Sequence, residues 1–423
     1  MMRRALRRRR GTEAFTSDAL PDVASSQWWT SEQIAEYQAR RIRLIVEHAY
    51  EETRFYRERM RRLGLRPSSI QGPDDLRAIP PVDRAEVQAS RESILVVRDV
   101  HEEALSGGTT GHRLRWARTI PWLELFTACL WRGFGWAGLD RGTKLVSFYS
   151  RMGMVSGNSV IIEKAFELDT VEDDIRLIEE SGAEVAYVYA SAAYLLGRYL
   201  LETGRTLPLK SVITSCETLY DEQRAVIERA FGAEVFDNYG CNDGGAWGAE
   251  CTEHDGLHQD VERAVVEFVD GRMVSTDLWN TAFPFIRYAN GDAGEWVPGA
   301  CACGRSSPRM KLAGRVADLL VTPVRTIFPS TLNFAFLKPW IRDARAIQRS
   351  ALDVEVLVAP EGAATPTDLA GLEEELAGLF EGMRVSLRVV ETIPPTLSGK
   401  HRIGINLADV DPLPAPSPAP AGA

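Results

Sequence analysis

The 423-residue sequence lacks the features that mark membrane and secreted proteins. Its most aromatic stretch, residues 123–139, is interrupted by Glu124 and Arg132, so no apolar run reaches the length of a membrane span. No apolar segment follows the basic residues 1–10 to complete a signal peptide, and we expect residues 1–27 to form a disordered basic tail. We therefore expect a cytoplasmic protein with no membrane partner.

Positive charge and cysteine are also scarce. Six of the 49 Lys and Arg residues lie in the first ten positions, so the rest of the chain is more acidic than the formal net charge of −10. Such an acidic body argues against a nucleic-acid partner. Six cysteines in a chain of this length favour reduced thiols that bind metal or take part in catalysis over a disulfide framework.

A loop rich in glycine and hydroxyl side chains follows Leu105. It consists of Ser106, Gly107, Gly108, Thr109, Thr110 and Gly111. Backbone N–H groups and hydroxyls in such a loop suit phosphate oxygens, although a flexible surface turn is the alternative. It is not a Walker loop, because His112 and Arg113 stand where that motif has Lys and Ser or Thr.

Apolar runs alternate with helical patterns between residues 143 and 240. We expect strands at 145–149, 185–189, 212–215 and 235–239, separated by helices at 170–181, 192–202 and 222–231. This alternation predicts an α/β fold with a largely parallel sheet, whose ligands bind beyond the carboxyl ends of the strands. Residues 215–217 and 238–243 follow two such ends and are candidate site positions.

The regions on either side have their own patterns. A capping box at Thr30–Gln33 begins a long helix or a kinked pair that ends at Gly64, and a Trp- and Phe-rich helix is expected at 120–136. A β-hairpin is expected at 265–278, and a small α+β unit has strands at 354–358 and 385–390. We expect a large N-terminal domain (28–314), a small mobile C-terminal domain (315–411) and a Pro/Ala-rich tail (412–423).

Five motifs occur in a specific order along the chain. The glycine-rich loop is followed by Tyr239-Gly240-x-x-Asp243, Tyr288-x-x-Gly291-Asp292, Gly314-Arg315 and Pro395-Thr396-Leu397-Ser398-Gly399-Lys400. In this order they resemble the adenylate-forming (AMP-forming) acyl-CoA synthetase superfamily, and within it the phenylacetate-CoA ligase group. Trp28-Trp29, His48-Ala49 and Ile79-Pro80 also resemble the start of that group, so the resemblance covers residues 28–405.

The resemblance implies that the chain binds ATP. The Ser106–Gly111 loop would hold the β- and γ-phosphates, Glu217 and Tyr239 would border the adenine, and Asp292 would accept hydrogen bonds from the ribose. Arg315 would lie at the hinge between the domains, close to the nucleotide. Without the other motifs, Asp292 would be read as a turn residue after Asn-Gly.

Two further residues take roles from the resemblance. Asp243 stands where the family usually has a Glu ligand of Mg²⁺, and its shorter side chain would shift the metal or hold it through water. Lys400 is the candidate catalytic residue, since its ammonium would stabilise the negative charge that develops at phosphorus. As an isolated residue it would be a solvated lysine.

Four residues form a candidate zinc site. Cys301 and Cys303 are a tight pair, and Cys251 and His258 form a second pair seven residues apart. Cys₃His is a common set for structural zinc, while two ordinary thiols are the alternative for the Cys-x-Cys pair. The phenylacetate-CoA ligase group has a similar Cys…Gly-Leu-His and Cys-x-Cys-Gly-Arg arrangement, which favours zinc.

The sequence departs from the family pattern at three places. His112 replaces the lysine that usually follows the phosphate loop, and Ala317 replaces the hinge acid two residues after Arg315. Residues 322–329, which would line the pantetheine tunnel, contain Pro323 and Val324 where the family usually has glycine. Formation of an acyl adenylate is therefore better supported by the sequence than formation of a thioester.

The leading hypothesis is an enzyme that activates a carboxylic acid, with an aromatic acid favoured, using ATP and Mg²⁺ and then passes the acyl group to CoA. A small-molecule acid is the expected partner, and we expect a homodimer. The rivals pass the adenylate to an amine, a hydroxyl or a small inorganic acid such as nitrite, or adenylylate a cofactor. A catalytically inactive, zinc-stapled binding module is the remaining alternative, against which Lys400, Asp292 and Tyr239 argue.

Overall fold

The computed structural model describes residues 20–106, 114–148, 159–162, 170–327, 329–336, 338, 340–394 and 402–408. Two compact units can be distinguished. Unit 1 contains residues 1–267, 273–290 and 296–311, and unit 2 contains residues 268–272, 291–295 and 312–423. The expected domain ranges, 28–314 and 315–411, stay a prediction. Residues 1–19 of the expected basic tail and the whole Pro/Ala-rich tail lie outside the described residues, whereas residues 23–26 of the expected basic tail form helix α2.

Helices cover the N-terminal part of unit 1. Thr30 caps α3, Ser31–Glu52, in a capping box with Gln33, and Thr53 both ends α3 and caps α4, Arg54–Arg62. Of the two expected alternatives, one long helix or a kinked pair, the structure shows the pair. The shorter elements of this part are α2 (Val23–Ser26), η1 (Pro67–Ser69), η2 (Asp74–Ala78), β1 (Val82–Asp83), α5 (Arg84–Ala89), α6 (Arg91–Ile94) and η3 (Val97–Asp99).

A two-stranded hairpin and one long helix follow. Strands β2 (Glu102–Leu105) and β3 (Arg115–Arg118) pair antiparallel, with Leu105 opposite Arg115. Helix α7, Ile120–Trp136, begins where the Thr119 side chain accepts a hydrogen bond from the backbone of Trp122. This confirms the aromatic-rich helix that the sequence predicts.

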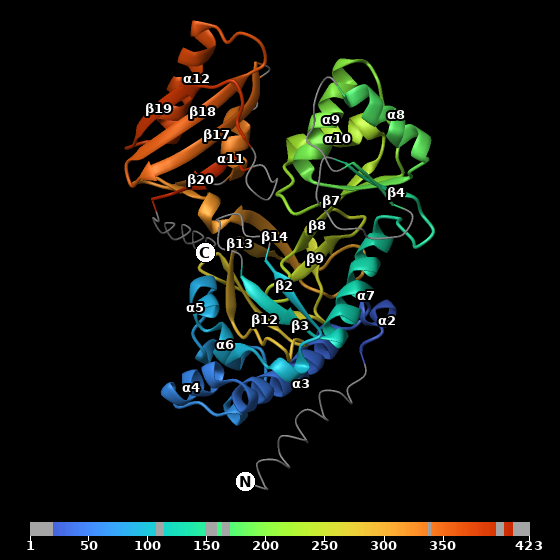
Figure 1. Cartoon of the computed structure of the whole chain (residues 1–423), viewed down its shortest axis with the longest axis vertical. Helices are drawn as coiled ribbons and strands as arrows, with labels where there is room; N and C mark the ends of the chain where they lie inside the picture. The colour runs from blue at the N-terminus through green and yellow to red at the C-terminus, as the bar shows by residue number, and fades with distance from the viewer. Residues whose placement is uncertain are drawn as a thin grey trace, which may run out of the picture. The chain divides into compact units, whose positions relative to one another are not determined.

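The α/β class is confirmed by a mixed sheet whose middle strands are parallel. Strands β5, β4, β6, β7 and β8 lie side by side and parallel, and α8, α9 and α10, green in Figure 1, pack beside them. These elements are β4 (Leu145–Phe148), β5 (Ser159–Ile162), α8 (Val171–Ser181), β6 (Val185–Val188), α9 (Ala190–Glu202), β7 (Ser211–Ser215), α10 (Asp221–Phe231) and β8 (Glu234–Gly240). Gly182 and Gly232 end α8 and α10 in the left-handed conformation.

The same sheet continues antiparallel beyond β8. The strand order in the described residues is β11-β12-β13-β14-β10-β9-β8-β7-β6-β4-β5, and β1 pairs with β13. The added strands are β9 (Trp247–Glu250), β10 (Leu257–Gln259), β11 (Ala264–Val269), β12 (Arg272–Asp277), β13 (Tyr288–Val297) and β14 (Arg309–Arg315). The expected hairpin at 265–278 corresponds to β11 and β12.

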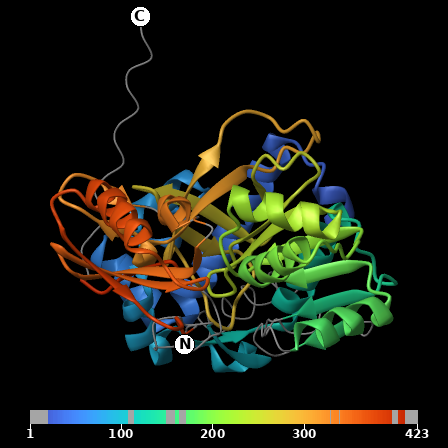
Figure 2. The same ribbon diagram turned by 90° about the horizontal axis from the view of Figure 1, so that it is seen from above.

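Unit 2 is built on a four-stranded sheet with the order β19-β18-β17-β20. Figure 2 shows α12 against this sheet, where Leu372 and Leu376 pack on Val354, Val356 and Val358. The elements are η4 (Val316–Asp318), β15 (Leu320–Val321), β16 (Thr326–Ile327), α11 (Pro329–Phe336), β17 (Ile341–Ser350), β18 (Asp353–Pro360), α12 (Pro366–Leu379), β19 (Arg384–Val389) and β20 (Gly404–Asn406). None of the described helices in either unit is long and apolar enough to cross a membrane.

Candidate active site

The glycine-rich loop joins the two strands of the β2–β3 hairpin. Ser106 and Leu114 hold its ends together, because the Ser106 amide donates to the Leu114 carbonyl at 2.8 Å and the Leu114 amide donates to Ser106 Oγ at 2.9 Å. The remaining predicted residues, Gly107, Gly108, Thr109, Thr110 and Gly111, lie outside the described residues, as do His112 and Arg113. The structure therefore fixes where the loop begins and ends.

Asp243 lies in a short loop after β8. The Cys241 amide donates to the Ala246 carbonyl at 2.8 Å and closes this loop. Gly244 has a φ of 95°, and a Cβ there would lie 2.6 Å from Ser275 Oγ, so the loop packs closely on β12 and requires glycine at this position. The packing holds the buried Asp243 carboxylate at the carboxyl end of β8.

Arg84 joins Asp243 to the glycine-rich loop. Its Nη1 donates to Ser106 Oγ and its Nη2 donates to Asp243 Oδ2, both at 2.9 Å. Tyr288 also donates its hydroxyl to Asp243 Oδ2 at 2.9 Å. Burial, reinforced by the adjacent carboxylate, raises the pKa of Tyr288, so the hydroxyl keeps its proton.

Arg84 is a site residue that the sequence analysis missed. It is separated from Asp243 by 159 positions, and no spacing rule connects the two. Its position follows from the pairing of β1 with β13, which sets Val82 opposite Tyr288 and places the start of α5 beside the Asp243 loop. The local sequence around Arg84 offers one weak sign of this role, a basic residue directly after the two-residue strand β1.

Glu217 and Tyr239 lie at the carboxyl ends of two adjacent parallel strands, β7 and β8. Glu217 comes just after β7, and its Oε2 accepts a hydrogen bond at 3.0 Å from the backbone N–H of Ser191 in the first turn of α9. Tyr239 lies in β8, where its hydroxyl accepts from Asn290 Nδ2 at 2.9 Å. Both predicted adenine-site residues therefore lie at the carboxyl edge of the parallel strands, where the topology predicts ligand binding.

The predicted ribose and hinge residues form an ion pair within unit 2. Arg315 Nε lies 3.0 Å from Asp292 Oδ1, and the Asp292 side chain is only 11% exposed. Next to the departure at Ala317, Asp318 binds Arg402 through a partly buried ion pair. Lys400, the predicted catalytic residue, lies outside the described residues.

The four predicted zinc ligands lie together in unit 1. Their ligand atoms, Sγ of Cys251, Cys301 and Cys303 and a ring nitrogen of His258, all lie within 4.8 Å of one another. Cys251 Sγ is 3.7 Å from Cys301 Sγ, and Cys303 Sγ is 3.3 Å from His258 Nε2. A tetrahedron with Zn–S bonds of 2.3 Å has edges of about 3.8 Å, so the spacing fits a zinc ion.

A second layer of contacts orients His258. Its Nδ1 lies 3.0 Å from Ser307 Oγ and 3.2 Å from the Ser307 carbonyl, which leaves Nε2 directed at Cys303. Burial lowers the pKa of His258 to about 4, so the ring is in the neutral form that binds metal. Trp136 packs edge-on against the ring at 5.8 Å, and Arg305 stacks on Trp136.

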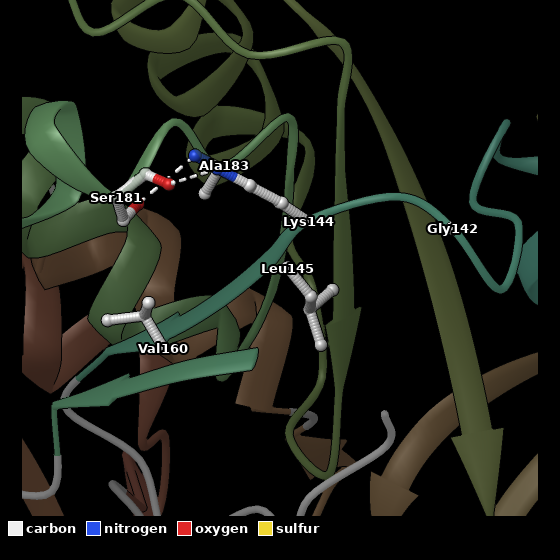
Figure 3. Close-up of a pocket in the computed structure, with 6 residues that line it drawn as sticks. All are labelled: Gly142, Lys144, Leu145, Val160, Ser181 and Ala183. Carbon is white, nitrogen blue, oxygen red and sulfur yellow. Dashed lines mark hydrogen bonds between the residues drawn. The ribbon is translucent and has the colours of Figure 1, made fainter. Parts of the chain in front are cut away.

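The structure also contains a pocket that is unrelated to these sites. Its volume is about 210 Å³, and Lys144 and Ser181 line it together with Gly142, Leu145, Val160 and Ala183 (Figure 3). Lys144 Nζ donates to the Ser181 carbonyl at the end of α8. Because Lys144 precedes β4, this pocket lies at the amino end of a parallel strand, away from the edge that carries Glu217 and Asp243.

Comparison with known sequences confirms the resemblance found from the motifs. The phenylacetate-coenzyme A ligase of Thermus thermophilus is 25% identical over 337 residues, which cover 72% of this chain and 76% of that protein. The phenylacetate-coenzyme A ligase of Pseudomonas putida is 24% identical over 336 residues, with the same two shares. No protein-family model matches the chain.

Comparison with solved structures confirms the fold. The chain superposes on 2-hydroxyisobutyryl-CoA ligase, solved in its postadenylation state with an acyl adenylate, with a TM-score of 0.73 and 19% identity over 93% of this chain and 94% of that one. An amide bond synthetase from Marinactinospora thermotolerans matches with a TM-score of 0.52 and 15% identity over 72% of this chain and 67% of that one. Adenylate-forming ligases with different acceptors thus share this fold.

Proposed function

We propose that this chain, which resembles the phenylacetate-coenzyme A ligases, activates a carboxylic acid with ATP and transfers the acyl group to CoA. A carboxylate oxygen attacks the α-phosphorus of ATP, the bond to pyrophosphate breaks, and an acyl adenylate forms. The CoA sulfur then attacks the acyl carbon, loses its proton, and AMP leaves. The relatives named above, together with the arrangement of motifs, support this assignment.

The observation that carries the proposal is the link from Ser106 through Arg84 to Asp243. A fixed guanidinium lies between the first residue of the glycine-rich loop and a buried carboxylate. Phosphate oxygens that enter the loop would be stabilised by this charge, since planar guanidinium groups bind phosphate well. The family usually has a lysine at the position of His112, and a histidine is not always charged. Arg84 would thus supply the positive charge of that lysine.

Asp243 is the residue that fits a bound Mg²⁺. Its Oδ2 accepts from Arg84 and Tyr288, whereas its Oδ1 contact among the described residues is the weak Cys241 thiol donor at 3.6 Å, which lies closer to the Asp243 carbonyl, at 3.0 Å. A hard oxygen ligand therefore remains for the metal, directly or through water. Mg²⁺, when bound, would neutralise charge on the phosphate oxygens. Tyr288 would hold the carboxylate in place by its hydrogen bond.

Other predicted residues complete the proposed nucleotide site. Tyr239 would stack on the adenine beside Glu217, and Asp292 would bind the ribose hydroxyls while Arg315 fixes its orientation. Lys400 would act on the reacting phosphate and carboxylate. The Ser106–Gly111 loop would hold the β- and γ-phosphates.

The Cys251–His258–Cys301–Cys303 cluster is proposed as a structural zinc site. Four protein ligands at tetrahedral spacing leave no open position for a substrate, so the ion would join the turns after β9 and β13 rather than take part in the reaction.

The expected homodimer also stays a prediction, which analytical ultracentrifugation tests.

The experiment that tests the proposed function is a screen of carboxylic acids for pyrophosphate release from ATP, with and without CoA. We expect release only with a suitable acid, and mass spectrometry should detect the acyl adenylate without CoA and the acyl-CoA with it. Pyrophosphate release that does not depend on any acid would contradict the proposal.

One observation favours a second candidate, in which the acceptor is an amine or a small inorganic nucleophile such as nitrite. The Thr322–Arg325 loop is a closed turn, because the Thr322 amide donates to the Arg325 carbonyl and Thr322 Oγ1 accepts from the amides of Val324 and Arg325. Pro323 packs against Gly382, where a Cβ would lie 3.1 Å from the proline ring. This loop therefore has little backbone freedom to admit pantetheine.

A further inference from the structure

A buried arginine, Arg263, lies between β10 and β11 and is 2% exposed. Within the described part of the chain, neither of its Nη atoms has a hydrogen-bond partner. Burying the N–H donors of a guanidinium without acceptors is costly, so this position requires compensation from its surroundings or from a ligand.

Aromatic rings and two carboxylates compensate the charge of Arg263. Its Cζ lies 4.9 Å from the ring centres of Trp122 and Phe126 and 5.7 Å from that of Trp247, which permits cation–π attraction. Arg263 also attracts the buried carboxylates of Asp277 and Asp260. Asp277 directs its oxygens elsewhere, however, since it accepts from Trp122 Nε1 at 2.6 Å and from two backbone amides. The positive charge of Arg263 is therefore compensated, but its Nη donors still lack hydrogen-bond acceptors among the described residues.

A second unpaired donor lies on the same cluster. The Nε1–H of Trp247 is buried and has no acceptor among the described residues. Trp247 pairs with Gly240 across β8 and β9, and a Cβ at Gly240 would lie 2.0 Å from the indole ring. The indole thus covers the backbone directly after Tyr239 and before the Asp243 loop. The Trp247 ring therefore lies beside both Gly240 and the Arg263 guanidinium.

We propose that Arg263 and Trp247 select an acid whose apolar, preferably aromatic, body carries an uncharged hydrogen-bond acceptor such as a carbonyl, hydroxyl or ether oxygen. This inference rests on the proposed function and names the substrate class of that site. An acceptor is required because the unpaired Nη atoms of Arg263 and Nε1 of Trp247 are donors. A second carboxylate on the substrate is disfavoured because the buried carboxylates of Asp277 and Asp260 already act on Arg263, and another buried anion would be uncompensated.

The expected consequence is selectivity. An acid without the acceptor would leave the donors of Arg263 and Trp247 buried and unpaired in the complex, and sites built to hydrogen-bond a substrate group reject analogues that lack it. The apolar rings of Trp122 and Phe126 suit a flat substrate body. Arg263 is therefore a specificity-determining residue and takes no part in the bonds that form or break.

The test compares kcat/KM for acid-dependent pyrophosphate release with phenylacetic acid and with its 2-, 3- and 4-substituted hydroxy, acetyl and carboxy derivatives. We expect at least one hydroxy or acetyl derivative to exceed the parent acid by about tenfold or more, and the carboxy derivatives to fall below it. Arg263→Met should bring the preference ratio close to one. Trp247→Phe, which keeps the ring and removes the N–H, should lower the same ratio.

Arg118→Met is the matched control, because Arg118 stacks on Trp116 and Trp122 but pairs with Glu102 at 2.9 Å. It should leave the ratio unchanged. Arg263→Lys replaces Arg263→Met if the methionine variant does not fold. A preference for the parent acid or for a carboxy derivative would overturn the proposal. So would an unchanged preference ratio in both Trp247→Phe and the folded Arg263 variant. The absence of pyrophosphate release with every acid would instead overturn the proposed function, and this inference with it.

Discussion

The Cys/His cluster and the Arg84–Asp243 link are both assembled from distant parts of the chain, but they differ in charge. In the cluster, three sulfur atoms and one imidazole nitrogen face one another, and the Arg305 side chain bonds to Cys303. At the other site, the guanidinium of Arg84 already neutralises the carboxylate of Asp243. The proposed zinc ion would stabilise the folded cluster, whereas Asp243 already has a cationic partner in Arg84, which can exchange partners with a ligand.

Because of this difference, we expect changes at one site to affect stability and changes at the other to affect the rate of turnover. Perturbing the cluster should lower the free energy of unfolding, because metal that binds only the folded state stabilises it. Perturbing the Arg84–Asp243 site should lower the rate of adenylation with little effect on unfolding.

Lys400→Ala should reduce acid-dependent pyrophosphate release by on the order of 10²–10³, because a single group that stabilises a charged transition state contributes this much. The melting temperature should not change. Lys338→Ala is a control in the same unit, since Lys338 pairs with Glu375 and has no proposed role in the reaction. Unchanged adenylate formation in Lys400→Ala would remove this residue from the proposed mechanism.

Arg84→Met should reduce pyrophosphate release by about 10², because it removes the guanidinium that the loop and Asp243 share. The effect should appear mainly in kcat, since the charge acts on the departing pyrophosphate. Arg91→Met is the matched control, because Arg91 is similarly exposed (19% against 23%) and pairs with Glu103 away from Asp243. Equal losses in both variants would show a general electrostatic effect.

Removal of zinc should lower the melting temperature by on the order of 5 °C or more and leave adenylation at moderate temperature largely intact. Elemental analysis of protein purified without chelator should find one zinc per chain, and Cys303→Ser should lack it. Cys216→Ser, at an exposed cysteine, should retain both the zinc and the melting temperature. Native stability and metal content in Cys303→Ser would rule out the proposed site.

The acceptor step should show the smallest effect, a thioester half-reaction several times slower than adenylation. The physical reason is the closed Thr322–Arg325 turn with Pro323 packed on Gly382. Single-turnover kinetics measure both steps. Discharge of the preformed adenylate by CoA at least as fast as its formation would refute slow transfer, whereas an adenylate that persists with CoA and reacts with an amine or nitrite would identify another acceptor.

Local signals predicted much of the fold. The capping box at Thr30 and the left-handed glycines at 182 and 232 mark helix ends that the chain sets by itself. Strand β17, Ile341–Ser350, was not predicted, because Arg342, Arg345 and Arg349 interrupt its apolar pattern. The short strands β9 and β10 lack enough residues to show a period.

The residues of the candidate sites also divide into those that the sequence predicted and those that it did not. Ordered motifs predicted Asp243 and the Cys/His ligands, since each lies in a recognisable short pattern. Arg84 and Arg263 could not be predicted, because their roles arise from tertiary contacts with residues more than 100 positions away, Asp243 for Arg84 and Trp122 for Arg263. Sequence spacing carries no information on such pairs, and only the folded chain shows them.

The central claim, activation of an acid as its adenylate, is tested most directly by exchange of labelled pyrophosphate into ATP. The account predicts exchange that requires both Mg²⁺ and a suitable acid and that proceeds without CoA, because adenylation is reversible and precedes transfer. Folded protein that shows no exchange across a broad panel of acids, or exchange that is independent of any acid, would contradict it.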